Sequence, residues 1–330
     1  MSDPRPDTTM TSLLDLDFLW VTGKGGVGKT TIAAALAEVA ARSGRRVLVC
    51  EMDAKGALAT AFEVGELRFD PTEVDPGLFA MTMSTEDSLR EYIRLFVKIP
   101  LLGRIGPLAS TLDFVADAAP GVKEILAVGK LCYEVRERHY DLVVVDAEAS
   151  GHVVSQIGAP KVIADLVHVG LVRDQTQWML DILEDPTRTG VTVVTTPEEM
   201  PVTESIDLLE RLTGETGTHP AAVVANRVLP ALFTRREQPI ARRLGDVVDV
   251  LERCIGPGAA SVVEAGMIIE ARRALGAEHL DRLREAIDRL ALRADGAALP
   301  IITVPELFGR SHGRRVVSRV ADCLQDEFDA

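Results

Sequence analysis

The sequence predicts an α/β protein with a doubly wound, mostly parallel sheet and helices on both of its faces. Short apolar runs of strand length alternate with longer helical patterns along the 330 residues, as expected of repeated strand and helix units. The first unit sets the pattern. The apolar run 18–22 is followed by a glycine-rich loop and by the alanine-rich, helix-favouring segment 31–42.

The second strand is expected at 47–52, after Gly44 ends the first helix, and it finishes at Asp53. Later apolar runs predict further strands at Leu78–Met83, Leu142–Val145, Val191–Thr195, Ala221–Ala225 and Pro300–Val304. A long helical pattern covers Val262–Ala294 and could break at Gly276. The length permits one large domain or two ordinary ones. No internal repeat is visible, and we expect a single domain over residues 1–330.

Two segments are longer than simple crossovers require. The first, at about 84–138, opens with the N-cap candidate Ser84 and with Asp87 three residues later; the second covers about 153–186. Both are rich in leucine, isoleucine and valine, and we expect them to form a helical insert subdomain. The insert helices could present an apolar groove, or they could pack only on each other and on the sheet.

The loop after the first strand matches the phosphate-binding pattern G-x-x-x-x-G-K-[ST]. Its glycines let backbone N–H groups close around a phosphate chain, Lys29 reaches the outer phosphates, and the Thr30 hydroxyl can ligate Mg²⁺. The following helix directs its N-terminal dipole at the same anion. The expected nucleotide contacts in this loop are Gly23, Lys24, Gly25, Gly26, Val27, Gly28, Lys29, Thr30 and Thr31.

Lys24 is the most informative residue of the loop, because a loop that already holds Lys29 against the phosphates has little room for a second lysine. The pattern Lys-Gly-Gly-x-Gly-Lys-Thr resembles the deviant Walker A group, which includes MinD, ParA, the nitrogenase iron protein and the ArsA and tail-anchored-protein-targeting ATPases. The resemblance implies that Lys24 crosses a dimer interface and neutralises charge on the opposite ATP. Such a catalytic lysine would couple dimer closure to hydrolysis.

Composition narrows the choice within this group. A net charge of −14 argues against a nonspecific nucleic-acid surface, which would need clustered cations. No apolar run approaches the roughly 20 residues of a membrane span, and residues 1–17 lack the basic and apolar regions of a secretory signal. We therefore expect a cytoplasmic protein without a nucleic-acid partner.

The four cysteines are far apart in the sequence, at Cys50, Cys132, Cys254 and Cys323, and no C-x-x-C pair occurs. Four free thiols are expected, with Cys50 buried in a strand. Neither a zinc site nor a sequence-local thiolate site for arsenite or antimonite is supported.

Asp146 follows the strand Leu142–Val145, where P-loop enzymes place the carboxylate that holds Mg²⁺ through water. The segment from Asp146 through Glu148 and Gly151 to His152 resembles the second switch of the ArsA and tail-anchored-targeting ATPases. Further stretches that resemble these relatives are Ala119–Gly121, Thr195–Glu198, Val223–Pro230 and Val304–Gly309. Together they span about residues 18–310, and the chain resembles a single-loop bacterial member of the ArsA-type ATPases.

The resemblance implies roles for further residues. Asp53 occupies the position of the first-switch aspartate that orients the attacking water, although Ala54, Lys55 and Gly56 replace the residues usual after it. Asn226 matches an adenine-contacting asparagine, and the absence of Asn-Lys-x-Asp favours ATP over GTP. By the same resemblance Pro305 lines the base pocket and Glu204 contacts the nucleotide across the dimer.

Glu148 departs from the family pattern, because a small residue or proline is usual there. An extra carboxylate near the γ-phosphate could weaken ATP binding or slow hydrolysis, could point to solvent, or could help to bind the metal. We expect slow turnover. His152 fits the family's switch histidine, although a lone histidine can also be purely structural.

Three functions remain open at this point. The chain could be a dimeric ATP-driven switch with Mg²⁺ as cofactor, which captures or releases a membrane-protein client or acts with a membrane partner. It could be the soluble motor of an anion or metalloid exporter. It could also bind ATP without hydrolysing it, as the scaffold subunit of a heterodimer with a homologous ATPase; the sequence does not distinguish a homodimer from a heterodimer.

Overall fold

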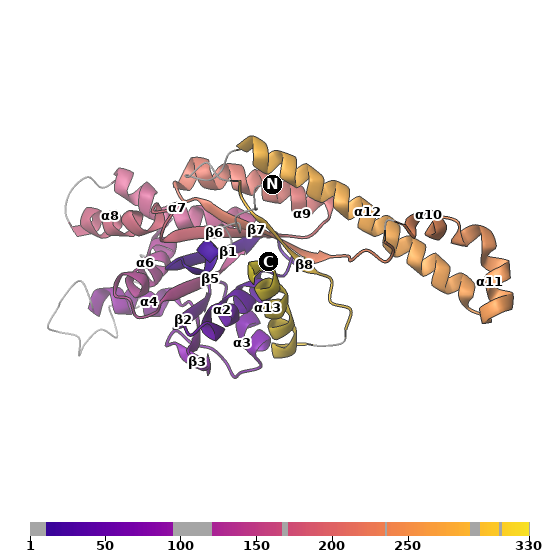
Figure 1. Cartoon of the computed structure of the whole chain (residues 1–330). Coiled ribbons are helices and arrows are strands. Elements are labelled where there is room, and N and C mark those ends of the chain that lie inside the picture. Colours follow the sequence, from indigo (N-terminus) through magenta and orange to yellow (C-terminus); the bar gives the residue numbers. More distant parts are fainter. Residues whose placement is uncertain are drawn as a thin grey trace, which may run out of the picture.

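The computed structural model describes residues 11–94, 121–166, 171–234, 236–290, 298–309 and 312–329, and it confirms the predicted α/β class (Figure 1). Eight strands form one sheet in the order β3-β4-β2-β5-β1-β6-β7-β8. Neighbouring strands are parallel except for the pair β3 and β4. The strands are β1 (Phe18–Gly23), β2 (Val47–Glu51), β3 (Thr72–Asp75), β4 (Leu78–Thr82), β5 (Leu142–Ala149), β6 (Thr189–Thr195), β7 (Pro220–Val228) and β8 (Ile301–Pro305).

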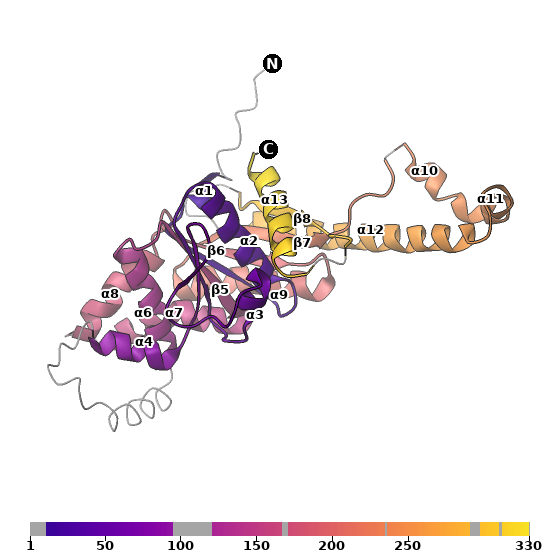
Figure 2. The same ribbon diagram turned by 90° about the horizontal axis from the view of Figure 1, so that it is seen from below.

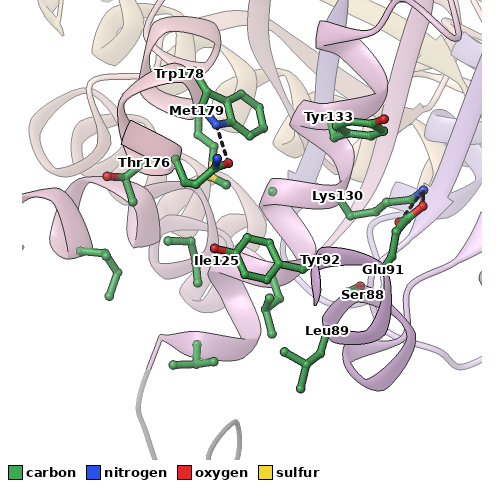
Figure 3. A pocket seen from close by; sticks show the side chains of 15 residues that line it. Ser88, Leu89, Glu91, Tyr92, Ile125, Lys130, Tyr133, Thr176, Trp178 and Met179 are labelled. Atoms are coloured by element: carbon green, nitrogen blue, oxygen red, sulfur yellow. Dashed lines mark hydrogen bonds and ion pairs between the residues drawn. The ribbon is translucent and has the colours of Figure 1, made fainter. Parts of the chain in front are cut away.

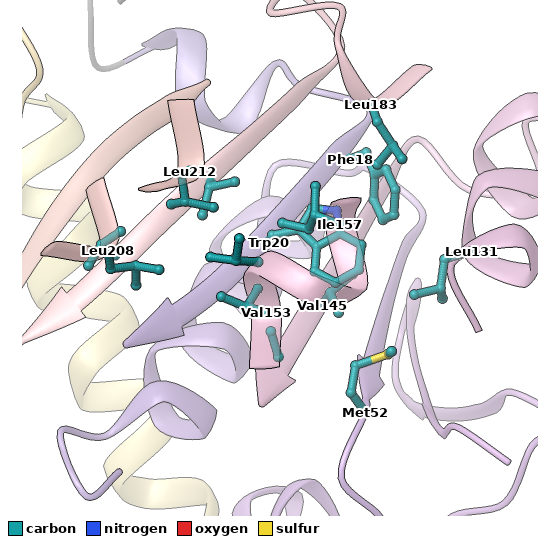
Figure 4. Packing of buried hydrophobic residues seen from close by; sticks show 14 of the residues in the cluster. Phe18, Trp20, Met52, Leu131, Val145, Val153, Ile157, Leu183, Leu208 and Leu212 are labelled. Carbon is teal, nitrogen blue, oxygen red and sulfur yellow. The ribbon is translucent and has the colours of Figure 1, made fainter. Parts of the chain in front are cut away.

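Helices cover both faces of the sheet, as β1 illustrates. Phe18 and Trp20 point into one core, which Figure 4 shows together with Leu208 and Leu212, whereas Leu19 and Val21 point into the other. The first core is closed by α6 (Val122–Arg136), α7 (Ser150–Leu166), α8 (Leu171–Leu183), α9 (Glu199–Arg211) and the π-helix η3 (Leu212–Thr216). The second is closed by α1 (Thr11–Leu14), α2 (Lys29–Arg42), α3 (Ala57–Phe62) and α13 (Arg314–Asp329).

The predicted strands are all present, with two differences. The sequence analysis missed β3, because this edge strand is short and polar, with only Val74 buried. It also ended the fifth strand at Val145, whereas β5 continues to Ala149. The extension is stabilised by β1, since Gly23 pairs with Ala149 and the Thr22 hydroxyl donates to the carbonyl of Glu148 at 3.2 Å.

Four helices occupy the predicted insert segments: α4 (Thr85–Tyr92), α6, α7 and α8. The Ser84 hydroxyl accepts from the backbone N–H of Asp87, which confirms the N-cap prediction. The helices pack on one another in the pairs α4 and α6, α6 and α7, and α7 and α8. Residues 95–120 and 167–170 of these segments, including the resembling Ala119 and Pro120, lie outside the described residues.

A helical arm extends beyond the sheet (Figures 1 and 2); its long helix confirms the helix predicted from Val262 onward, whereas its shorter helices were not predicted. It consists of α10 (Gln238–Ala241), the 3₁₀ turn η4 (Leu244–Val247), α11 (Val248–Ile255) and α12 (Ala259–Leu290). The far part of α12 packs on α11, and the other end packs on α9. No helix in the described part of the chain has the length and apolar character needed to span a bilayer.

The suggested helix break at Gly276 was wrong, because α12 runs through this residue without interruption. Gly276 instead permits a close approach. A Cβ atom there would lie 3.1 Å from Cβ and 3.2 Å from the carbonyl oxygen of Pro197, in the segment between β6 and α9. The glycine therefore marks one of the points where α12 packs on the body of the protein; Leu280, Leu283 and Ile287 further along the helix lie in the first core.

We predict that Gly276→Ala will not stabilise the protein, although alanine is the better helix former by about 1 kcal/mol. The gain in propensity is offset by crowding against Pro197. Gly266→Ala in the same helix is the matched control, since a Cβ atom there meets no described atom within 4 Å. Denaturant unfolding should show Gly266→Ala stabilised by about 0.5 to 1 kcal/mol. Equal stabilisation of both variants would contradict the packing argument.

Candidate nucleotide-binding and hydrolysis site

The phosphate loop connects the end of β1 to the first residue of α2. Gly23 has φ +147°, and any Cβ there would overlap the carbonyl oxygen of Val194 on β6. At Gly25 and Gly26, by contrast, a Cβ would meet no described atom within 4 Å. The loop is therefore tightly packed where it leaves the sheet and open where a phosphate would approach its backbone.

Asn226 on β7 holds the loop in place. Its side chain is buried, its Nδ2 donates to the carbonyl of Val27 at 2.8 Å, and its Oδ1 accepts from the N–H of Arg227 at 3.0 Å. Gly28 (φ +97°) makes the contact possible, since a Cβ there would lie 2.5 Å from Nδ2 of Asn226. The sequence analysis predicted only an adenine contact for Asn226 and missed this bracing role.

The base-pocket predictions for Asn226 and Pro305 stay predictions, but the structure brings their strands together. Pro305 ends β8 and is in register with Val228, two residues after Asn226. The N–H of Glu306 donates to the carbonyl of Val228 at 2.9 Å. Both residues therefore lie at the same edge of the sheet as the phosphate loop.

Thr30 and Asp146 meet at the base of the loop, where the Thr30 hydroxyl donates to Asp146 Oδ2 at 2.6 Å. Asp146 is only 5% exposed, and its Oδ1 has no hydrogen-bond partner among the described residues. Burial raises the pKa of this carboxyl to about 6, against the opposing effects of Thr30 and Lys29. The pair therefore combines a hydroxyl with a buried, incompletely compensated carboxylate.

This donor set fits the magnesium ion that the sequence predicts. Mg²⁺ prefers hard oxygen ligands and usually keeps several waters and substrate phosphates in its shell, so Thr30 and Asp146 would be sufficient protein contributions, with Asp146 acting through water. No cluster of three or more His, Cys, Asp or Glu side chains suited to a metal occurs in the described ranges. A complete all-protein metal site is therefore not the arrangement found in this part of the chain.

Lys29 lies over the loop and is more than half buried. Burial is the largest influence and lowers the pKa of its ammonium group, Lys55 lowers it further, and Asp146 and Asp53 raise it. Its Nζ donates to the carbonyl of Lys24 at 3.4 Å. A phosphate chain on the loop would supply the anionic partner that favours the charged form.

Lys24 points away from this position. Its ammonium group forms an ion pair with Glu204 on α9 of the same chain, and each side chain is about one-third exposed. The structure thus brings together two residues that the sequence analysis assigned separately to contacts across a dimer. In the single subunit Lys24 and Glu204 are each other's partners.

The first switch also contains an ion pair. Asp53 pairs with Lys55; the Lys55 side chain is largely exposed and that of Asp53 about half exposed. Lys55 is one of the residues in which the chain departs from the family pattern; its charge lowers the pKa of Lys29, and its own pKa is raised chiefly by the hydrogen bond to Asp53 and also by the charge of Glu148. In this arrangement the Asp53 carboxylate would have to leave Lys55 before it could hold a water.

Glu148 is turned along the first turns of α7. Gln156 Nε2 donates to its Oε1 at 2.9 Å, and His152 Nδ1 lies 3.8 Å from its Oε2. The structure therefore places two predicted switch residues, Glu148 and His152, side by side, with Gly151 in the same turn. Gln156 was missed by the sequence analysis; its spacing of eight residues from Glu148 carries no recognisable motif.

A comparison with known families agrees with the geometry. The family model described as anion-transporting ATPase of the ArsA type matches residues 16–175 and 168–246, which is more than half of the chain. The chain belongs to the ArsA ATPase family. The ArsA resemblance inferred from the sequence is thus confirmed, and the protein is an ATPase.

Individual relatives extend this finding along the chain. ATPase BagA of Mycobacterium tuberculosis is 30% identical over 302 residues, which are 87% of this chain and 85% of that protein. A putative arsenical pump-driving ATPase of Halobacterium salinarum is 28% identical over 260 residues, 70% of this chain and 39% of that protein. ATPase GET3 of Podospora anserina is 28% identical over 166 residues, about half of each chain.

We predict that Asp146→Asn will stabilise the nucleotide-free ATPase while abolishing Mg²⁺-dependent hydrolysis. Because the pKa of Asp146 is raised from 3.8 to about 6, its ionised form is disfavoured in the folded state. The contribution of Asp146 to the free energy of unfolding of the wild type is therefore least favourable above pH 6, and it becomes more favourable as the pH falls from 6 towards 4. At pH 7.5 Asn should raise the free energy of unfolding by about 1 to 3 kcal/mol.

Denaturant unfolding from pH 4 to pH 8 measures this effect. Asp53→Asn is the control, because its exposed carboxylate should change the free energy of unfolding by less than about 0.5 kcal/mol. An Asp146→Asn protein that is less stable than wild type at pH 7.5 would show that the buried charge is already compensated.

Proposed function

We propose that this ArsA-family ATPase is a dimeric switch, in which two subunits close around ATP and each supplies Lys24 to the other's nucleotide. The observation that carries the proposal is the position of Lys24. Within one subunit Lys29 is the lysine that lies over the loop. The ammonium group of Lys24 is instead partly exposed and pairs with Glu204 on α9. Closure would exchange this internal ion pair for contacts with the partner's phosphates, where positive charge favours phosphoryl transfer.

Different residues of the chain would bind the phosphates, hold the metal ion and orient the attacking water at each nucleotide site. The loop N–H groups and Lys29 bind the phosphates, while Thr30 and Asp146 would hold Mg²⁺, which neutralises phosphate charge when it is bound. Asp53 would orient the attacking water after releasing Lys55. This sequence of events predicts slow turnover, because hydrolysis would have to await both the release of Asp53 and the arrival of a second Lys24.

The site is connected directly to the insert helices. No loop separates β5, which carries Asp146 and Glu148, from α7, which begins at Ser150. In turn α7 packs on α6 and α8. A shift of the second switch on closure or hydrolysis would therefore be transmitted to these helices, as expected of a nucleotide-driven switch.

A cavity among these helices offers a place for a client. It has a volume of about 270 Å³ and lies between α4, α6, α7 and α8, with an apolar lining that includes Leu89, Ile125, Trp178 and Met179 (Figure 3). The buried cation at its edge, Lys130, is paired with Glu91 at 2.8 Å and with Glu134 at 2.6 Å. The lining therefore favours an apolar client segment, such as one from a membrane protein, captured in the cytoplasm.

The cysteines do not support the alternative of a metalloid exporter motor. Cys50 and Cys132 are fully buried, and burial strongly raises the pKa of both thiols. Thiols held in the neutral form inside the core are poor ligands. The remaining two, Cys254 on α11 and Cys323 on α13, lie on helices at different parts of the fold.

Mixing two inactive variants tests whether Lys24 acts across the dimer. Lys24→Ala and Lys29→Ala should each lose at least about 100-fold in ATPase rate. In a mixed dimer the intact loop of the Lys24→Ala subunit faces the intact Lys24 of the other subunit. Random pairing should therefore restore about a quarter of the wild-type rate, one working site in half of the dimers.

The matched control mixes Lys24→Ala with the double variant Lys24→Ala/Lys29→Ala. In this mixture no subunit with an intact Lys29 faces a partner that carries Lys24, so no working site forms. If the wild-type protein is active but the mixture of single variants is not, Lys24 acts within its own subunit and the proposal is wrong. Activity that appears only with a co-purified homologous ATPase would show that the dimer is a heterodimer.

Leu89→Ser should weaken binding of a fluorescent peptide containing one apolar helix by about 3- to 10-fold, since the cavity loses apolar contact. Ile240→Ser is the control, because Ile240 is an exposed apolar residue on the distant arm. Fluorescence anisotropy measures the affinity, and basal ATPase activity should be unchanged in both variants. Equal affinities for Leu89→Ser and wild type would place the client elsewhere.

A further inference from the structure

Glu51, the last residue of β2, is a buried carboxylate with an unusual set of partners. It is 2% exposed and lies in register with Asp146 on β5. Its Oε1 accepts from the backbone N–H groups of Lys55 at 3.1 Å and Ala57 at 2.9 Å, and its Oε2 accepts from that of Leu58 at 3.2 Å. One side chain thus accepts hydrogen bonds from three backbone N–H groups of the segment that follows Asp53.

Two of these donors, the N–H groups of Ala57 and Leu58, belong to the first turn of a helix that lacks a local cap, whereas the N–H of Lys55 also donates to the carbonyl of Asp53. The helix α3 begins at Ala57, and its N-cap residue, Gly56, has φ +73° and no side chain to accept from the first turn. Unpaired N–H groups at a helix N-terminus require an acceptor and favour a negative charge. Glu51 supplies both from a neighbouring strand and replaces the missing cap.

The start of the same segment is fixed independently. The N–H of Met52 donates to the carbonyl of Asp146 at 3.1 Å, and the N–H of Met83 donates to the carbonyl of Glu51 at 2.8 Å. Between the anchor at Met52 and the anchor at Lys55 only residues 53 and 54 remain. The backbone that carries Asp53 is thus held on both sides.

We propose that Glu51 is the positioning residue of the first switch. By holding the N–H groups of residues 55, 57 and 58, it fixes the backbone on the far side of Asp53 and confines movement of the switch to residues 53 and 54. The Asp53 side chain can then exchange Lys55 for a water, while α3 stays in place. The proposal rests on the proposed function, in which Asp53 orients the attacking water.

The electrostatic surroundings agree with this role. Asp53 and Lys55 both act on the charge of Lys29, so the anchored segment lies close to the phosphate loop. A displacement of about 1 Å in a water-orienting carboxylate is enough to reduce a rate markedly. Glu51 itself is enclosed and has three donors, and it therefore acts through Asp53 and not on the nucleotide.

Hydrogen exchange of the nucleotide-free protein tests the anchor without requiring hydrolysis. In the wild type the amides of Lys55, Ala57 and Leu58 should exchange more slowly than that of Ala54. Glu51→Gln, which loses the charge and one acceptor, should accelerate the amides of Ala57 and Leu58 by about 10-fold or more, and that of Lys55 less, because its N–H also donates to the carbonyl of Asp53. Similar exchange at residues 54 to 58 in the wild type, or unchanged protection in the variant, would overturn the proposal even if the variant were unstable.

Steady-state kinetics tests the positioning role. Glu51→Gln should lower kcat by about 10-fold while KM for ATP changes by less than about twofold, because the phosphate loop is untouched. Glu38→Gln is the matched control: Glu38 is a buried glutamate of α2 that accepts from Arg42 at 2.6 Å and Ser318 at 2.9 Å. It should leave kcat and the exchange of residues 55 to 58 unchanged.

The outcomes separate this proposal from the proposed function. Faster exchange with an unchanged kcat would reduce Glu51 to a helix cap and overturn the positioning role. A wild type that shows no turnover, alone or with a homologue, would overturn the switch function, while the exchange measurement would still decide whether Glu51 anchors the segment.

Discussion

The hydrogen bond between Thr30 and Asp146 is the contact on which the rest of the site depends. It joins the first helical residues after the phosphate loop to the central strand β5, and it leaves one oxygen of a buried carboxylate without a partner among the described residues. Burying such a charge is costly unless a cation or further donors arrive. The nucleotide-free protein therefore carries a desolvation cost at Asp146 that a bound Mg²⁺ ion can reduce. The surrounding residues are arranged around this carboxylate.

Three contacts adjust this centre, and two of them, those of Asn226 and Glu204, join distant parts of the chain. Asn226 braces the loop from β7, Glu51 holds the segment after Asp53 from β2, and Glu204 keeps Lys24 away from its own loop. Each contact fixes backbone or charge without occupying the space over the loop. The continuous passage from β5 into α7 then links the centre to the insert helices and their cavity.

Much of the fold could be predicted because buried parallel strands appear in the sequence as apolar runs. The phosphate loop could be predicted because its glycine, lysine and threonine residues follow a fixed spacing. The polar edge strand β3 gives no such signal. The partners of Lys24 and Asn226 lie 180 and 199 residues away in the sequence, and no local pattern specifies them. No sequence motif predicts the hydrogen bond between Gln156 and Glu148. Gly276 suggested a helix break, but this glycine permits a close approach of α12 to Pro197.

The uncompensated charge of Asp146 should recruit Mg²⁺ together with the nucleotide that the ion accompanies. Titration calorimetry at pH 6, in buffers of different ionisation enthalpy, measures the protons released when a preformed complex of Mg²⁺ and a non-hydrolysable ATP analogue binds. A carboxyl with a pKa of about 6 is half protonated at this pH, and a bound cation displaces its proton. Wild type should therefore release about half a proton more than Asp146→Asn. Equal proton release by the two proteins would contradict this role of Asp146.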